Sequence, residues 1–292
     1  MNEPVLRDVQ CLDSRGLHRM AYWQWGDAAN PKVLVCVHGL TRQGRDFDAL
    51  ARSLCGDYRV VCPDVVGRGR SDWLADPAGY VVPSYVADMV SLLARLDAQA
   101  VDWVGTSMGG LIGLGLASLD GAPVRKLVLN DVGPVIEAPA LQRIGSYVGQ
   151  SGFWRTLDEA ADAAWALSQG FGPHSREQWL ALTAPQLKPA TRDGQDGFTT
   201  RVDPGIAVPF RAITPELARA GEAMLWQAYD RLRCRTLLLR GAQSDLLSAD
   251  TARAMTQRGP RAQLHEFAGV GHAPTLVHDD QIEVLRRFLL SP

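Results

Sequence analysis

The chain lacks the features that would place it across a membrane, on a membrane surface or on nucleic acid. It has no run of about 18 apolar residues, the length that a membrane-spanning helix needs. Its formal net charge is −2 over 292 residues, so no excess of positive charge is available to bind nucleic acid or anionic lipid. The first ten residues are polar and contain no apolar stretch of the kind found in signal peptides. We therefore expect a cytoplasmic protein.

Cysteine is also scarce, with five residues, an odd number, and no Cys-x-x-Cys pair. A disulfide framework or a zinc site would need paired or regularly spaced cysteines. Cys36 and Cys62 stand inside apolar runs, where a small buried thiol is the simplest interpretation. We expect neither a metal nor an organic cofactor. The content of 46% hydrophobic and 21% charged residues is ordinary for one large globular domain with an inserted subdomain.

Short apolar runs alternate with helical patterns along most of the chain. Such alternation predicts a parallel sheet covered by helices, with right-handed crossovers. Two further segments, joined by Ser14-Arg15-Gly16, predict a hairpin and hence an antiparallel edge. The expected strands are 9–13, 19–25, 33–37, 59–62, 101–104, 126–129, 236–239 and 262–267, and the expected core helices are 47–54, 84–96, 108–117, 249–258 and 281–290.

The alternation stops between about residues 132 and 226. This stretch is rich in proline, glycine and tryptophan, and its periodic segments at 138–148, 157–168 and 176–187 favour helices, with a turn at 193–197. We interpret it as a helical cap inserted between two core strands. The predicted organisation is an α/β core formed by 1–132 and 227–292, with the cap at 133–226.

The motif Gly105-Thr106-Ser107-Met108-Gly109 follows an apolar strand and opens a glycine-rich helix. A sharp strand-to-helix turn of this kind holds a serine hydroxyl above the sheet, and the helix N-terminus favours developing negative charge. The bare motif arises often by chance, but its placement between strand and helix is specific. We predict that Ser107 is a nucleophile.

A serine nucleophile needs a base, and the base needs an acid that orients it. His272 lies in a glycine-flanked loop between the last core strand and the last helix, so we predict that it is the base. We predict Asp245, in the loop after strand 236–239, as the acid, because the chain order Ser, Asp, His accompanies this elbow. Asp131, directly after strand 126–129, is the rival candidate. His18 and His278 are interpreted as surface residues.

An acyl-transfer intermediate also needs two N–H donors aimed at its oxyanion. The residue after the nucleophile, Met108, supplies one through its main chain. Leu40, in the loop His38-Gly39-Leu40 after strand 33–37, is predicted to supply the other. The His38 imidazole is expected to anchor this turn by hydrogen bonds.

With these pieces in place, the chain resembles the α/β-hydrolase superfamily over nearly its whole length. The matching segments are 35–40, the Asp-x-x-Gly-x-Gly-x-Ser loop at 64–71, the elbow at Ser107, the Asp245 loop and Gly271-His272. The resemblance implies an α/β-hydrolase fold: a mostly parallel eight-stranded sheet flanked by helices, with the cap after strand six. It also implies that Asp64 is structural. A serine nucleophile separates the chain from haloalkane dehalogenases and epoxide hydrolases, whose elbow carries aspartate.

Members with a serine at the elbow include carboxylesterases, enol-lactonases, carbon–carbon bond hydrolases and some acyltransferases. The chain is similar to small bacterial esterases and enol-lactonases, and intracellular hydroxyalkanoate-oligomer hydrolases also fit. We expect an acyl-enzyme mechanism on a small-molecule ester or lactone. Carbon–carbon cleavage, acyl transfer and a ligand-binding receptor on the same fold stay open as alternatives.

Specificity is expected to reside in the cap. Four of its aromatic residues, Trp154, Trp165, Trp179 and Phe210, are candidates for an apolar substrate pocket. The alternative for each is packing between the cap helices, since aromatic side chains bury large areas wherever they stand. Arg143 is a candidate for contact with a substrate carboxylate, against the simpler interpretation of a solvated surface arginine.

Overall fold

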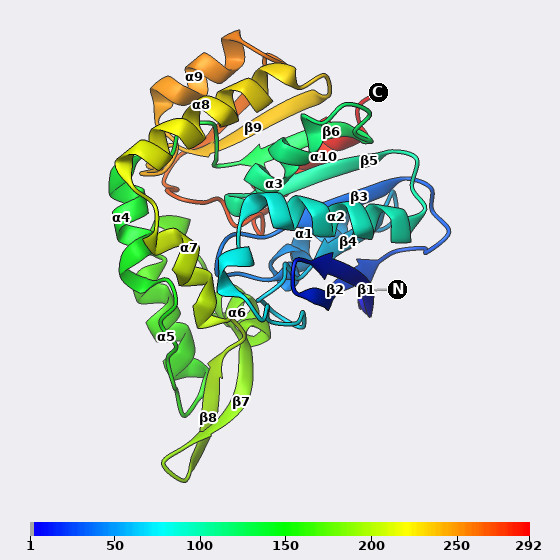
Figure 1. The fold of residues 1–292 in the computed structure, drawn as a ribbon. Helices are drawn as coiled ribbons and strands as arrows, with labels where there is room; N and C mark the ends of the chain where they lie inside the picture. The colour runs from blue at the N-terminus through cyan, green and yellow to red at the C-terminus, as the bar shows by residue number, and fades with distance from the viewer. Residues whose placement is uncertain (1–2) are drawn as a thin grey trace.

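An eight-stranded sheet forms the centre of the protein in a computed structural model that describes residues 3–292 (Figure 1). Its strand order is β1-β2-β4-β3-β5-β6-β9-β10. β1 pairs antiparallel with β2, and β2 pairs antiparallel with β4, whereas all other neighbours are parallel. The structure thus confirms the predicted fold class, including the antiparallel edge.

The strands of this sheet are β1 (Val5–Asp13), β2 (Gly16–Trp25), β3 (Val33–Val37), β4 (Arg59–Pro63), β5 (Val101–Thr106), β6 (Val124–Asn130), β9 (Arg235–Gly241) and β10 (Gln263–Phe267). The core helices are α1 (Asp48–Leu54), α2 (Val82–Leu96), α3 (Met108–Ala117), α9 (Ala249–Gln257) and α10 (Asp279–Leu290). The insertion holds α4 (Ala138–Tyr147), α5 (Leu157–Leu167), α6 (Arg176–Thr183), β7 (Leu187–Arg192), β8 (Gln195–Thr200), α7 (Ala207–Arg211) and α8 (Pro215–Arg231), and short 3-10 turns join several of these elements.

The parallel strands between β2 and the largely exposed edge strand β10 are buried on both faces, which explains their nearly continuous apolar sequences. Every residue of β3 is buried, and its side chains alternate between two apolar clusters, one on each face of the sheet. One cluster joins the sheet to α2, α3 and α9, and the other joins it to α1 and α10. Two helical layers therefore fix the sheet, and its carboxyl edge is left to carry a site.

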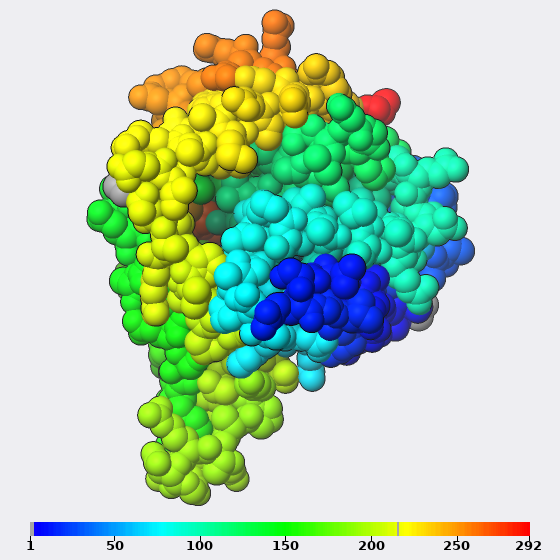
Figure 2. Space-filling model, in the orientation of Figure 1, coloured from blue at the N-terminus to red at the C-terminus, as the bar shows by residue number. Residues whose placement is uncertain are grey.

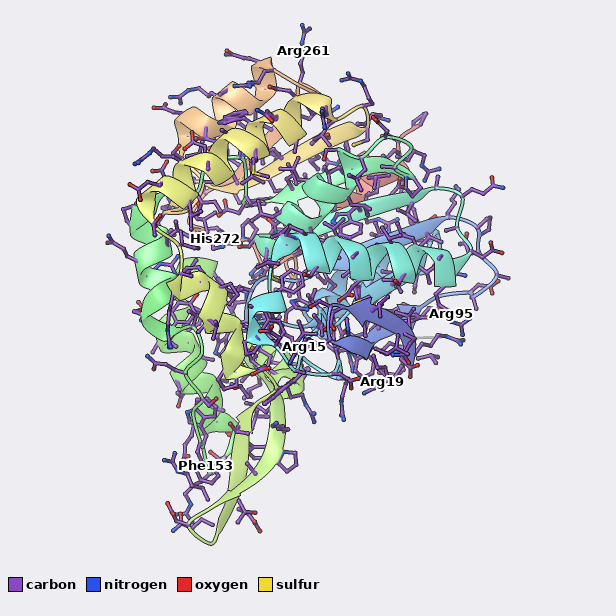
Figure 3. All side chains as sticks on the ribbon, viewed as in Figure 1. Arg15, Arg19, Arg95, Phe153, Arg261 and His272 are labelled. Atoms are coloured by element: carbon purple, nitrogen blue, oxygen red, sulfur yellow. The ribbon has the colours of Figure 1, made fainter. Side chains whose placement is uncertain are left out.

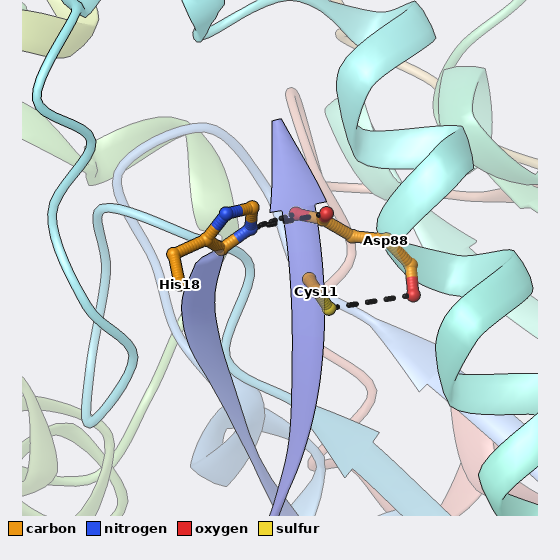
Figure 4. A group of neighbouring side chains, drawn as sticks. All are labelled: Cys11, His18 and Asp88. Carbon is orange, nitrogen blue, oxygen red and sulfur yellow. Dashed lines mark hydrogen bonds and ion pairs between the residues drawn. The ribbon is translucent and has the colours of Figure 1, made fainter. Parts of the chain in front are cut away.

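The β1–β2 hairpin is fastened to α2 by a buried polar group (Figure 4). His18 Nε2 lies 3.1 Å from both carboxylate oxygens of Asp88, and the Cys11 thiol faces the main-chain carbonyl of Asp88. Burial, together with the Asp88 carboxylate, raises the pKa of the Cys11 thiol to about 12. The interpretation of His18 as a surface residue was wrong, because its imidazole pairs with a helix that is remote in sequence.

The sequence predicts a helical insertion, but the insertion also contains two strands. Its helices α4, α5 and α6 begin where expected, but β7 and β8 form a two-stranded antiparallel hairpin that projects away from the core (Figure 1). The expected turn at 193–197 shortens to Asp193 and Gly194, both with positive φ. The positive φ angles of Asp193 and Gly194 reverse the chain within two residues, so β7 and β8 can pair along their full length.

The last cap helix crosses the predicted end of the cap. α8 runs past residue 226 to Arg231, and Tyr229 is buried against α9, where its hydroxyl donates to the Met255 carbonyl at 2.6 Å. The end of α8 therefore packs with the core, while its start belongs to the insertion. The division into core and cap stays a prediction, and its second boundary falls inside a helix.

Within the described part of the chain, no helix combines the length and apolarity needed to cross a bilayer.

Candidate active site

The turn at Ser107 has the strained geometry of a nucleophile elbow. Ser107 joins β5 to α3 with φ 51° and ψ −116°, a conformation that costs a non-glycine residue on the order of 1–3 kcal/mol. A Cβ on Gly105 would lie 2.2 Å from the Gly109 carbonyl oxygen, and a Cβ on Gly109 would lie 2.0 Å from that of Val37. Only glycine permits this close crossing of strand, helix and neighbouring loop, which explains the motif's spacing.

His272 faces Ser107 from the loop between β10 and α10. Its Nε2 lies 3.0 Å from Ser107 Oγ, which is hydrogen-bonding distance. A Cβ on Gly241 would lie 2.2 Å from the Gly271 carbonyl oxygen, so the end of β9 and the histidine loop touch at backbone level. Figure 3 shows His272 at the opening between the core and the cap. The predicted pairing of Ser107 with His272 is present in the structure.

Asp131, and not Asp245, contacts the second nitrogen of the imidazole. Asp131 Oδ2 lies 2.6 Å from His272 Nδ1, and the carboxylate is fully buried. Asp245 instead forms a bidentate pair with Arg143 of α4, at 2.7 and 2.9 Å, and both side chains are 40% exposed. The arginine lowers the pKa of Asp245 against the effect of partial burial. The prediction that Asp245 orients His272 is therefore corrected to Asp131.

The carboxylate of Asp131 is held by three donors. Besides the imidazole, Gly241 N–H donates to Oδ1 at 2.9 Å, and the Ser244 hydroxyl donates to Oδ2 at 2.6 Å. Asp131 has a φ of 55°, and its own N–H donates to the Leu239 carbonyl at 2.8 Å. β6 and β9 are neighbours in the sheet. Asp131 follows the end of β6, and the end of β9 and its loop hold the carboxylate.

The predicted oxyanion donors lie beside the nucleophile. A Cβ on Gly39 would lie 3.8 Å from Ser107 Cβ, so the loop that contains Leu40 packs against the elbow. Among residues 3–292, the main-chain N–H groups of Leu40 and Met108 have no hydrogen-bond acceptor. Two free donors flanking a serine hydroxyl suit a tetrahedral oxyanion.

His38 anchors this loop, as the sequence predicted. Its Nδ1 lies 2.7 Å from the Gly39 carbonyl oxygen, and Val65 N–H donates to Nε2 at 2.9 Å. Burial lowers the pKa of His38 to about 3, so the ring stays neutral. Asp64 is structural too: its carboxylate accepts N–H groups from Gly44 and Arg70 at 2.7 and 2.8 Å.

The four predicted pocket aromatics have different positions. Trp179 is buried, donates to the Ala161 carbonyl at 2.7 Å, and meets Trp165 edge to face with ring centroids 5.1 Å apart. These two rings pack the cap. Trp154 pairs through its main chain with Phe198 of β8, in the part of the cap where Figure 3 labels Phe153, distant from His272. Phe210 packs against Gly145 of α4. None of these contacts is with the Ser107–His272 pair.

Two other cap residues, Phe171 and Leu182, line a cavity beside the site. The cavity, of about 40 Å³, has room for a few water molecules and adjoins Thr106 and Ala273, the neighbours of Ser107 and His272. A wider hollow opens between the α7–α8 segment and the chain before α2, and atoms of the segment near residue 270 lie at its floor (Figure 2). The hollow gives solvent a route towards the histidine loop.

In the described residues, one group of potential metal ligands comes together: Cys11, His18 and Asp88, whose ligand atoms lie within 4.8 Å of one another. The Cys11 thiol faces the main-chain carbonyl of Asp88. The imidazole and carboxylate are engaged with each other. We assign the group to fastening the hairpin.

Known proteins share both the fold and the sequence. A sequence model described as "Alpha/beta hydrolase family" matches residues 34–286. The chain belongs to this family. It is 55% identical to the 3-hydroxybutyrate-oligomer hydrolase of Cupriavidus necator, and the match covers 98% of this chain and 97% of that protein. Among solved structures, an alpha/beta hydrolase from Novosphingobium aromaticivorans is 36% identical with a TM-score of 0.85, and 99% of each chain is covered.

A hydrolase from Rickettsia typhi, described as putative in its structure's name, superposes with a TM-score of 0.86 at 28% identity, covering 98% of each chain. Together these relatives confirm the family, the fold and the reaction class predicted from the sequence. This alpha/beta hydrolase is an enzyme that hydrolyses esters. The 55% identity to the oligomer hydrolase favours that reaction over carbon–carbon cleavage, acyl transfer or ligand binding.

Proposed function

We propose that this alpha/beta hydrolase cleaves the ester bonds of short 3-hydroxybutyrate oligomers through a Ser107–His272–Asp131 triad. The observation that carries the mechanism is the placement of one imidazole between a serine hydroxyl at 3.0 Å and a buried carboxylate at 2.6 Å. The support for the substrate is the 55% identity, over nearly the whole chain, to a hydrolase of these oligomers.

In this mechanism, His272 Nε2 takes the proton of Ser107 as Oγ attacks the ester carbonyl. The oxyanion of the tetrahedral intermediate accepts hydrogen bonds from the N–H groups of Leu40 and Met108. His272 then protonates the departing hydroxyl of one 3-hydroxybutyrate unit, which leaves an acyl-serine. Water, activated by the same imidazole, releases the second acid and restores Ser107. Asp131 holds the imidazole in the required tautomer and stabilises the imidazolium.

The chemistry of a 3-hydroxybutyrate oligomer bears on the predicted role of Arg143. Each unit is short, with one methyl branch, and the chain ends in a free carboxylate and a hydroxyl. Arg143 is the cap arginine next to the Asp245 loop, but it is occupied by that carboxylate. The proposal therefore assigns no arginine to the substrate.

The test is hydrolysis of 3-hydroxybutyrate dimer, trimer and tetramer by the native protein and by Ser107→Ala, with release of monomer followed by chromatography. We expect native turnover and a loss of about a thousandfold or more in the variant. p-Nitrophenyl acetate, butyrate and octanoate serve as general ester substrates. Turnover of these esters without turnover of any oligomer would refute the oligomer substrate and leave the triad standing. Equal activity of native protein and variant would refute the triad.

A cytoplasmic location is part of this proposal. All five cysteines are free thiols, and three are buried, a pattern typical of a reducing compartment. Fractionation of the source cells, with activity assayed in each fraction, tests it.

A further inference from the structure

Arg68 carries a buried positive charge that no carboxylate neutralises. Its side chain is 0% exposed, and within residues 3–292 no acidic oxygen lies within ion-pair distance of its guanidinium. The guanidinium is surrounded instead by neutral acceptors and by the faces of Tyr80 and Tyr85, with ring centroids 5.6 and 5.2 Å away. A buried cation without a counter-ion destabilises a fold, so the position calls for a physical explanation.

The acceptors around Arg68 belong to the oxyanion site. Its Nε donates to the Leu40 carbonyl at 2.8 Å, and Nη2 faces the Met108 sulfur at 3.6 Å. These are the two residues whose free main-chain N–H groups flank Ser107. Nη1 donates to the Val66 carbonyl at 2.7 Å and to the Tyr85 hydroxyl at 2.9 Å, which fixes the plane of the guanidinium.

The backbone of Arg68 is held on both sides by the insertion. Asp203 N–H donates to the Gly67 carbonyl at 2.8 Å, and Gly69 N–H donates to the Arg201 carbonyl at 2.9 Å. Arg68 itself, between Gly67 and Gly69, pairs with Val202 as an isolated antiparallel bridge. The segment after β8 therefore positions Arg68 from outside, while its side chain reaches inwards to the loop after β3 and to the start of α3.

We propose that Arg68 is a positioning residue of the oxyanion site. It fixes the backbone of Leu40 by binding its carbonyl, and it holds the Met108 side chain at the first turn of α3. Its charge also raises the electrostatic potential where negative charge develops on the substrate carbonyl. Arg68 does not touch the substrate, so its effect appears in the transition state and hardly in ground-state binding.

This inference rests on the proposed serine mechanism but not on the identity of the natural substrate. The test therefore uses a matched pair of simple substrates, p-nitrophenyl acetate and its thionoacetate analogue. In the analogue, sulfur replaces the carbonyl oxygen and accepts hydrogen bonds poorly, so a well-formed oxyanion site favours the oxygen ester. The ratio of the two kcat/KM values is independent of the fraction of protein that is folded.

We expect Arg68→Met to lower kcat for the oxygen ester by roughly 10- to 100-fold with KM changed by less than about threefold. The oxygen-to-sulfur ratio should fall by about tenfold or more. Arg68→Lys keeps the charge without the fork of donors, so its ratio should lie between those of Arg68→Met and the native protein. Ser107→Ala tests the serine mechanism separately, because it abolishes cleavage of the oxygen ester.

Lys126 provides a matched control at the opposite end of the sheet. It is also a buried cation held by main-chain carbonyls, with Nζ 2.8 Å from the Leu289 oxygen, but it contacts no residue of the site. Lys126→Met should lower stability and leave the substrate ratio at the native value. A native ratio in Arg68→Met, or an equal fall in Lys126→Met, would overturn the proposal.

Discussion

If Asp131 orients His272, substitutions of Asp131 and of Asp245, which follow adjacent strands of the sheet, should have very different effects on activity. Asp131→Asn should nearly abolish ester hydrolysis, whereas Asp245→Asn should change it by less than about threefold. In Asp131→Asn, the carboxamide can present its NH₂ group to His272 Nδ1, which stabilises the tautomer with the proton on Nε2. That nitrogen then cannot accept the proton of Ser107.

The expected magnitude follows from the contacts of each carboxylate. Asp131 is fully buried and 2.6 Å from the imidazole, the arrangement in which an Asp-to-Asn change lowers kcat by about 10⁴-fold in serine hydrolases with this triad. That loss corresponds to about 5 kcal/mol of transition-state stabilisation. Asp245 loses only its pair with Arg143, in which both side chains are 40% exposed. Exposed pairs of this kind contribute about 0–1 kcal/mol to folding.

The assay is hydrolysis of p-nitrophenyl butyrate at pH 8, with kcat corrected for the folded fraction measured by far-UV circular dichroism. Asp245→Asn is the matched control, because it makes the same chemical change on an adjacent loop. A loss of 10³-fold or more in Asp245→Asn, or a loss below tenfold in Asp131→Asn, would refute the geometry described above.

Two further predictions concern stability. Gly221 lies within α8 and a Cβ there meets nothing within 4 Å, so Gly221→Ala should raise the free energy of unfolding by about 0.5–1 kcal/mol in urea, and a decrease would contradict this. Burial raises the pKa of Asp64 from 3.8 to about 6, so the folded state binds that proton more tightly and Asp64 contributes stability at low pH that is lost as the pH rises through 6. Relative to Asp64→Asn, the native free energy of unfolding should fall by about 2 kcal/mol between pH 4 and pH 7, and parallel stability curves would rule this out.

Elements buried on both faces were predictable because burial imposes a simple composition. The apolar run 33–37 coincides with β3, and the expected helix 108–117 coincides with α3. The elbow was predictable for a related reason: a Cβ on Gly105 or Gly109 would lie only 2.0–2.2 Å from a backbone oxygen, so the motif records a steric constraint. Each of these features is determined by its own segment of sequence and by contact with one adjacent strand, helix or loop.

The sequence could not distinguish Asp131 from Asp245 as the partner of His272, because the answer depends on the path of the loop that carries each aspartate. Both aspartates follow core strands at the carboxyl edge of the sheet. Asp131 comes directly after β6, where its φ of 55° turns the carboxylate towards the histidine loop. Asp245 comes four residues after the end of β9, far enough for its side chain to reach the cap at Arg143. The β7–β8 hairpin was missed because only Leu187 among its strand residues is buried, so its sequence carries no apolar alternation.

The contacts between the insertion and the core converge on the loops that carry the site. Arg143 binds the Asp245 loop, and the Gly170 carbonyl accepts the N–H of Gly271, the residue before His272, at 2.6 Å. His174 Nε2 lies 2.8 Å from the Thr275 hydroxyl on the same loop. The segment at 201–203 binds the loop on either side of Arg68. Because these contacts join the insertion to the Asp245 loop, the histidine loop and the loop around Arg68, a change in how the insertion packs would reach His272 and Arg68 together. The insertion therefore supports the loops that carry the predicted catalytic residues.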